Sequence, residues 1–101
     1  MSAYFSIMAW DGPKGAVARA ESTAAHLAHI ETIMDKIAVA GPLKDSAGGN
    51  VGSLFVVTAA SAAEAEAILK TDPYFQAGVW DRWEVHSFIA AAGEWVGGKT
   101  W

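Results

Sequence analysis

The pattern of hydrophobic and polar positions divides the chain into short strands and two helices. Residues 3–10 and 53–59 are rich in aromatic and β-branched side chains, which is typical of strands. Between them, apolar residues recur at three- and four-residue steps, which predicts a helix over roughly residues 20–38. The periodic positions of this helix are Leu27, Ile30, Ile33, Met34 and Ile37.

Turn signals separate the elements of the first half. Asp11-Gly12-Pro13 ends the first strand, because these three residue types favour turns. Gly41-Pro42 lies in a short extended piece at residues 39–43, and residues 44–52 form a loop rich in Gly, Ser, Asn and Asp. The first half therefore reads as strand, helix, strand, loop and strand.

The second half contains two capping patterns. Ser61 and Glu64 form a capping box that opens a helix, which ends near Lys70 because Pro73 cannot continue it. Asp72 is placed to cap a short helical turn that starts with Pro73 and ends at Gly78. Residues 79–89 then form a long last strand.

The element order β-α-β-β-α-β predicts an α+β fold of the ferredoxin-like split βαβ type, with two helices on one face of an antiparallel sheet. Strict alternation in the last strand places Trp80 and Phe88 on the other face. That face is too apolar to be left to water. We expect a second copy to cover it, sheet against sheet, although a tail folded across the sheet would satisfy the same requirement.

Composition narrows the classes of function. The 101 residues predict a single domain, with its core at about 3–89 and an irregular Gly- and Trp-containing tail at 90–101. The net charge of −4 argues against a nucleic-acid partner. The chain has no cysteine, so disulfides, thiolate metal sites and cysteine nucleophiles are excluded. No membrane-spanning run or signal peptide is recognisable, and we expect a cytoplasmic protein without a membrane partner.

His26 is the main candidate for chemistry. It falls inside the apolar stripe of the first helix, whereas His29 lies about 100° away, at the margin of the stripe. One interpretation is a buried structural histidine bonded to backbone, and another is a general acid/base, because histidine exchanges protons near neutral pH. A metal site is a third, although neither a zinc-binding pattern nor cysteine is present.

Asp72 has a structural explanation as the cap of the turn that Pro73 begins. The same carboxylate can also hold an imidazole and fix its tautomer, as in a catalytic triad. We read the five tryptophans as indicating a partner surface or an aromatic pocket.

Several sequence pieces occur together in a characteristic order and spacing. They are His26-Leu27, Ala40-Gly41-Pro42-Leu43, Gly52-Ser53, Asp72-Pro73-Tyr74 and Ala77-Gly78-Val79. Over roughly residues 4–89 the chain resembles the YciI-like (YCII-related) family of small bacterial proteins. The resemblance implies a dimeric α+β barrel, in which two ferredoxin-like sheets meet, and a pocket with a paired histidine and aspartate at His26 and Asp72.

The resemblance also implies a small-molecule ligand, because one branch of the family eliminates chloride from a chlorinated hydroxyhydroquinone. Arg19 looks similar to an arginine that usually precedes the family histidine. A second basic residue is common just before the His-Leu pair, and here Thr23, Ala24 and Ala25 stand there instead. This departure puts in doubt a substrate whose anionic group needs two cations.

Three hypotheses follow. The first is a lyase or isomerase without metal or cofactor, in which His26 moves a proton on an enolisable cyclic or aromatic substrate and Asp72 orients it. Backbone amides near Gly41 or Ser53, or Arg19, would steady the oxyanion. The aromatic residues expected to line the pocket are Trp10, Tyr74 and Trp80. The alternatives are a non-catalytic ligand-binding dimer or accessory subunit, and a cofactor-free oxygenase of phenols.

Overall fold

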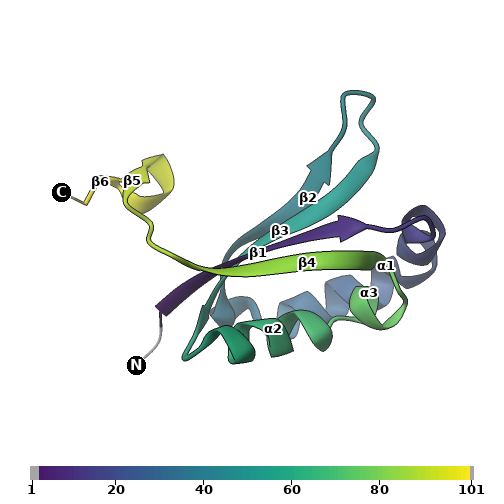
Figure 1. The fold of residues 1–101 in the computed structure, drawn as a ribbon, viewed down its shortest axis with the longest axis horizontal. Helices are drawn as coiled ribbons and strands as arrows, with labels where there is room; N and C mark the ends of the chain where they lie inside the picture. The colour runs from purple at the N-terminus through teal and green to yellow at the C-terminus, as the bar shows by residue number, and fades with distance from the viewer. Residues whose placement is uncertain (1–2, 101) are drawn as a thin grey trace.

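The computed structural model describes residues 3–100 and has the α+β fold that the sequence predicts. Its sheet is antiparallel, with strand order β2-β3-β1-β4. The strands are β1 (Ala3–Asp11), β2 (Ile37–Lys44), β3 (Asn50–Ala59) and β4 (Trp80–Phe88). The helices α1 (Gly15–Thr32), α2 (Ala62–Lys70) and α3 (Pro73–Gln76) lie on one side of this sheet (Figure 1).

The core lies between the helices and one face of the sheet. Phe5 and Ile7 of β1 pair with Val57 and Phe55 of β3, and all four side chains are buried. Leu69 of α2 closes this layer from the helix side. The odd-numbered positions of β1 and β3 therefore carry the hydrophobic contacts that fix the register of the sheet.

Both predicted caps of the second half are confirmed. The Ser61 side chain accepts a hydrogen bond from the Glu64 amide at 3.1 Å and caps α2. Asp72 Oδ1 accepts one from the Tyr74 amide at 2.8 Å and caps α3, with Pro73 in the first turn. Gly78 has a φ of +80°, a left-handed conformation that suits glycine after a helix end.

The boundaries of α1 differ from the prediction of residues 20–38. The helix begins at Gly15, where Lys14 makes no side-chain cap and so gives no start signal in the sequence. A Cβ at Gly15 would lie 2.7 Å from Asp11 Oδ2, so this start requires glycine. At the other end, a 3₁₀ turn η1 (Met34–Lys36) follows α1, and Ile37 pairs with Val57 of β3. Strand pairing thus outweighs the helical spacing of Ile37.

The prediction that Trp80 lies on the face away from the helices is wrong. The register of β1 and β4 shifts so that Trp10 opposes Arg82 while Asp11 opposes Trp80. This irregularity reverses the alternation at the start of β4. Trp80 is therefore 4% exposed and belongs to the core under the helices, whereas Phe88 does lie on the open face and is 40% exposed.

The tail is more ordered than the irregular segment that the sequence predicts. Strands β5 (Ala92–Gly93) and β6 (Gly98–Lys99) pair with each other around a 3₁₀ turn η2 (Glu94–Val96). Figure 1 shows this C-terminal segment reaching away from the sheet, and Trp95 is 84% exposed. The other tryptophan of the tail, Trp101, lies outside the described residues.

Candidate active site

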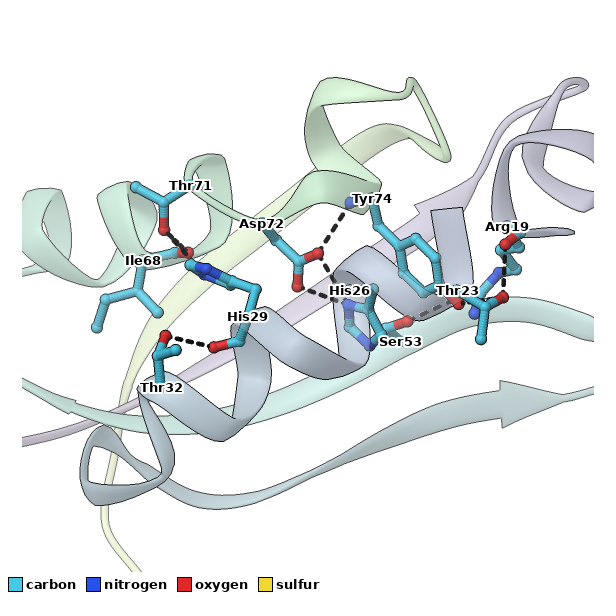
Figure 2. A network of polar contacts seen from close by, with 10 residues as sticks. All are labelled: Arg19, Thr23, His26, His29, Thr32, Ser53, Ile68, Thr71, Asp72 and Tyr74. Atoms are coloured by element: carbon cyan, nitrogen blue, oxygen red, sulfur yellow. Dashed lines mark hydrogen bonds and ion pairs between the residues drawn. The ribbon is translucent and has the colours of Figure 1, made fainter. Parts of the chain in front are cut away.

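The structure brings His26 and Asp72 together, as expected from the sequence. The imidazole Nδ1 of His26, on α1, lies 2.8 Å from Asp72 Oδ1 and 2.9 Å from Oδ2 (Figure 2). The side chain of Asp72 is only 2% exposed, and that of His26 is 15% exposed. A carboxylate can only accept, so Nδ1 carries the hydrogen of this contact, and in the neutral imidazole the lone pair is then on Nε2.

Asp72 performs its two predicted roles with one carboxylate. Oδ1 accepts both from the Tyr74 amide and from His26, so the cap of α3 fixes the carboxylate that orients the imidazole. The start of α3 therefore positions the histidine of α1. Both Asp72 oxygens face a donor, which explains how a carboxylate can remain buried here.

Tyr74 holds the imidazole from its flat side. The two rings are stacked, with their centroids 3.8 Å apart and their planes 7° from parallel. The Tyr74 hydroxyl donates to Thr23 Oγ1 at 3.2 Å, and Thr23 in turn donates to the Arg19 carbonyl at 2.6 Å. The tyrosine is thus fixed at both ends, and the plane of His26 is fixed with it.

Arg19 forms a second carboxylate pair on α1. Its Nε and Nη2 donate to the two oxygens of Asp11 at 2.7 and 2.8 Å, a bidentate pair. Nη2 also donates to the Gly52 carbonyl and to Ser53 Oγ, each at 3.1 Å. Hydrogen bonding to Asp11 raises the pKa of Arg19 above its ordinary value, although burial opposes this. The guanidinium therefore stays charged, and in the interior its charge is paired with the Asp11 carboxylate.

Glycine is required at position 52. A Cβ there would lie 2.4 Å from the Ala9 carbonyl oxygen, which no side chain tolerates. Only glycine lets β1 and β3 approach closely enough beside Arg19. This gives a physical reason for the Gly52-Ser53 pair of the sequence.

Beside these groups lies a cleft of ≈ 420 Å³ between α1, β2 and β3. Its walls are partly apolar, with a small set of polar side chains, a combination typical of small-molecule sites. The lining residues are Arg19, Thr23, His26, Leu27, Ile30, Ala40, Gly41, Pro42, Lys44, Asn50, Ser53, Phe55 and Tyr74.

Six of the eight residues predicted for the site lie together. His26, Arg19, Gly41, Ser53 and Tyr74 line the cleft, and Asp72 stands behind His26. Two tryptophans lie elsewhere and do not line it. Trp80 packs edge-on against Phe55 and Tyr74, in a layer behind the lining. Trp10 is even-numbered on β1 and therefore faces away from the helices, where its ring lies 4.3 Å from the Arg82 guanidinium carbon.

His29 is a half-buried residue at the margin of α1, as the spacing predicts. Its Nε2 lies 3.4 Å from Thr71 Oγ1, and Thr71 donates to the Ile68 carbonyl at 2.8 Å. His29 does not line the cleft. Among residues 3–100, no three His, Cys, Asp or Glu side chains gather as a metal site requires.

Sequence reasoning missed four polar residues of this region. Asp11 reads only as part of a turn, and its bond to Arg19 depends on how β1 meets α1. Lys44 and Asn50 read as loop residues, yet they pair at the end of the β2–β3 hairpin and line the cleft. In the sequence, Thr23 stands out only because the family commonly has a basic residue just before the His-Leu pair, and its bond to Tyr74 gives no signal there. Only the position of Thr23, one turn before His26, is a usable signal for any of them.

One protein family matches the chain over most of its length. A family model described as the YCII-related domain matches residues 3–89. No curated protein is significantly similar in sequence. Within residues 3–100 no helix is both long and apolar enough to cross a membrane.

One solved structure is similar in both sequence and fold. It is 5-chloro-2-hydroxyhydroquinone dehydrochlorinase (TftG) from Burkholderia phenoliruptrix AC1100, in complex with 2,5-dihydroxybenzoquinone. The identity is 29%, the TM-score is 0.78, and the match covers 90% of this chain and 96% of the other. A NIPSNAP family protein from Agrobacterium tumefaciens strain C58 has a TM-score of 0.50 at 12% identity, covering 88% and 92% of the chains, and shows the fold alone.

Proposed function

The chain belongs to the YCII-related family, and we propose that it is a small-molecule lyase that eliminates chloride from a chlorinated, enolisable hydroquinone. The observation that carries this proposal is the His26–Asp72 contact at 2.8 Å, with the imidazole lining a cleft. The similarity to a dehydrochlorinase with a bound dihydroxyquinone supports the substrate class. The cleft volume of ≈ 420 Å³ is enough for a single substituted ring.

The proposed reaction needs only proton transfers. His26 Nε2 takes a proton from a ring hydroxyl and gives it to the ring carbon that bears chlorine. This forms the keto tautomer and leaves Nε2 free to accept the proton of a second hydroxyl. A second hydroxyl then loses its proton, its electron pair moves into the ring, and the carbon–chlorine bond breaks to release chloride. The net change is loss of one proton and one chloride, with a hydroxyquinone as product and no oxidant or reductant consumed.

Asp72 acts in this scheme through His26. Its carboxylate keeps the hydrogen on Nδ1 and leaves the lone pair of Nε2 for the substrate. It also stabilises the imidazolium that forms when His26 accepts a proton. Tyr74 stacks on the ring and keeps Nε2 in a fixed direction.

The test is chloride release from 5-chloro-2-hydroxyhydroquinone, followed together with quinone absorbance under anaerobic conditions. We expect one chloride for each quinone formed, and loss of both signals in His26→Gln. Turnover that requires oxygen would contradict elimination and favour the oxygenase alternative. Turnover that survives in a folded His26→Gln variant would contradict the role of the histidine.

We further propose that the sheet face opposite the helices binds a second copy of the chain. Tyr4 and Phe88 pair across β1 and β4 on this face, and each is 40% exposed. Leu54 and Val56 of β3 extend the same apolar surface, which with the C-terminal segment encloses ≈ 870 Å³. Apolar side chains gathered on one exposed face are typical of a surface that another protein covers.

Sedimentation measures this association directly. We expect a dimer for the unmodified chain and a monomer for the double variant Leu54→Glu/Phe88→Glu. In the variant, each copy would bury two negative charges without partners at the interface. A monomer at all concentrations would contradict the proposal. The cytoplasmic location remains a prediction of the composition.

A further inference from the structure

The hydroxyl groups that line the cleft differ in whether their hydrogen already has an acceptor in the protein. Tyr74 donates its hydrogen to Thr23 at 3.2 Å, and Thr23 donates its own to the Arg19 carbonyl at 2.6 Å. Neither hydroxyl therefore has a hydrogen to offer to a ligand without breaking a bond. Each hydroxyl has one hydrogen only, so this count decides which of them can donate.

Ser53 is the exception. Its Oγ lies 3.1 Å from Nη2 of Arg19, and a guanidinium can only donate. The serine oxygen is therefore the acceptor, and its own hydrogen must point elsewhere. Within residues 3–100, the structure gives this hydrogen no acceptor. Ser53 is 6% exposed and lines the cleft that also contains His26.

We infer that the Ser53 hydroxyl is the donor that stabilises the oxyanion of the bound substrate, and that Arg19 strengthens this donor. This inference rests on the proposed function, because deprotonation of a hydroquinone creates the oxyanion in question. It assigns the base and the oxyanion donor to different elements of one cleft, with His26 on α1 and Ser53 on β3.

Arg19 makes the Ser53 hydroxyl a stronger donor. Its guanidinium is charged and held in place by the bidentate contact with Asp11, and its Nη2 also reaches the Gly52 carbonyl and Ser53 Oγ. Donation from a cation to Oγ draws electron density from the hydroxyl and makes its hydrogen a stronger donor. The positive charge of Arg19 thus makes the Ser53 hydroxyl a stronger hydrogen-bond donor to a ligand in the cleft.

The arrangement also favours a particular substrate class. A hydroxyl donor recognises a single phenolate or enolate oxygen, whereas a carboxylate or phosphate is better matched by a free guanidinium. Lys44 is the remaining cation of the lining, and it is exposed at the hairpin end. We therefore expect phenolates to bind better than benzoates of the same size.

The inference is tested by equilibrium binding, which needs no turnover. The probes are 2,5-dihydroxybenzoquinone and 4-nitrophenol, whose ionised forms absorb in the visible range. We expect Ser53→Ala to weaken binding of the phenolate form about tenfold, because a hydrogen bond to a charged oxygen is lost. Ser53→Thr keeps a hydroxyl and should remain within about threefold of the unmodified protein.

Thr58→Val is the matched control, because it removes a hydroxyl that lies on the same strand as Ser53 but does not line the cleft. We expect it not to weaken phenolate binding. Repeating the titrations at high salt separates Ser53 from Lys44, since screening weakens the attraction of an exposed cation but not a buried hydrogen bond. Should Ser53→Ala unfold, Ser53→Cys preserves the volume while replacing the hydroxyl with a weak donor, and the same loss is expected.

Equal affinity of the unmodified protein and a folded Ser53→Ala or Ser53→Cys variant would overturn the inference about Ser53 alone. Chloride release dependent on His26 would then still support the proposed function. If the unmodified protein binds neither probe at millimolar concentration, the proposed substrate class fails, and the assignment of Ser53 fails with it.

Discussion

Two carboxylate pairs lie along the same helix, seven residues apart, and we propose that only one of them takes part in chemistry. Arg19 pairs with Asp11 and His26 pairs with Asp72, and in both pairs the side chains are nearly or mostly buried. Nε and Nη2 of Arg19 donate to protein acceptors, and the guanidinium stays protonated at any physiological pH. In His26, Nδ1 contacts Asp72, whereas Nε2 remains available to a ligand in the cleft. In the proposed function, a ring nitrogen that is not bonded to the protein, rather than burial or charge, distinguishes the pair that reacts from the pair that only stabilises the fold.

Removing the reactive nitrogen should produce the largest effect. In His26→Gln we expect turnover to fall about 10³-fold, because general acid/base catalysis is lost. Stability should change little, since the glutamine amide can still donate to Asp72. Chloride release and urea denaturation measure the two quantities. A variant that retains activity, or one that fails to fold, would show that His26 is a structural residue like Arg19.

The structural pair should respond in the opposite way. In Arg19→Met we expect the free energy of unfolding to fall by about 3 kcal/mol, because Asp11 is left as a buried carboxylate without its partner. The matched control is Lys70→Met, which breaks an exposed ion pair with Glu66 and should cost less than about 0.5 kcal/mol. Similar losses in the two variants would mean that the Arg19–Asp11 pair contributes no more than a surface contact.

Asp72→Asn separates the two roles of one carboxylate. Asparagine can still cap α3 through the Tyr74 amide, so the fold should be retained. Its amide group can satisfy the imidazole in the other tautomer, which protonates Nε2 and removes the base. We therefore expect turnover to fall about 10²-fold with little change in the melting temperature. Unchanged turnover would mean that the aspartate serves only as a cap.

The smallest effect is expected where a group supports His26 without touching the substrate. Tyr74→Phe keeps the ring that stacks on the imidazole and removes only the bond to Thr23. We expect stability to fall by about 1 kcal/mol and turnover to change less than about threefold. Thermal unfolding and initial rates provide the measurements. A large loss of turnover would indicate that the Tyr74 hydroxyl itself takes part in the reaction.

The sequence predicts which helices and strands form better than it predicts where they end and which of their side chains face the core. Periodicity and capping residues locate the strands and α2, because these signals are local. The start of α1 at Gly15 depends on its approach to Asp11, and the burial of Trp80 depends on the register shift between β1 and β4. The start of α1 and the burial of Trp80 both depend on how segments pair, so the alternation of residues along one strand cannot predict them.

The same distinction applies to the site. His26 stands out because a polar residue on an apolar stripe needs a partner, and Asp72 stands out as a cap with a second oxygen. The roles of Arg19 and Ser53 depend on Asp11 and on the close approach at Gly52, which only the folded sheet defines. Residue type thus identifies the His26–Asp72 pair, whereas the geometry of the sheet reveals how Arg19 and Ser53 are held.

The tautomer of His26 is the most direct test of the account. Two-dimensional ¹H–¹⁵N spectra of histidine-labelled protein distinguish a protonated ring nitrogen from one that carries a lone pair. We predict that neutral His26 has its hydrogen on Nδ1 and its lone pair on Nε2, and that Asp72→Asn reverses this assignment. A hydrogen on Nε2 in the unmodified protein, or a spectrum that Asp72→Asn leaves unchanged, would contradict the claim that Asp72 keeps His26 as a base.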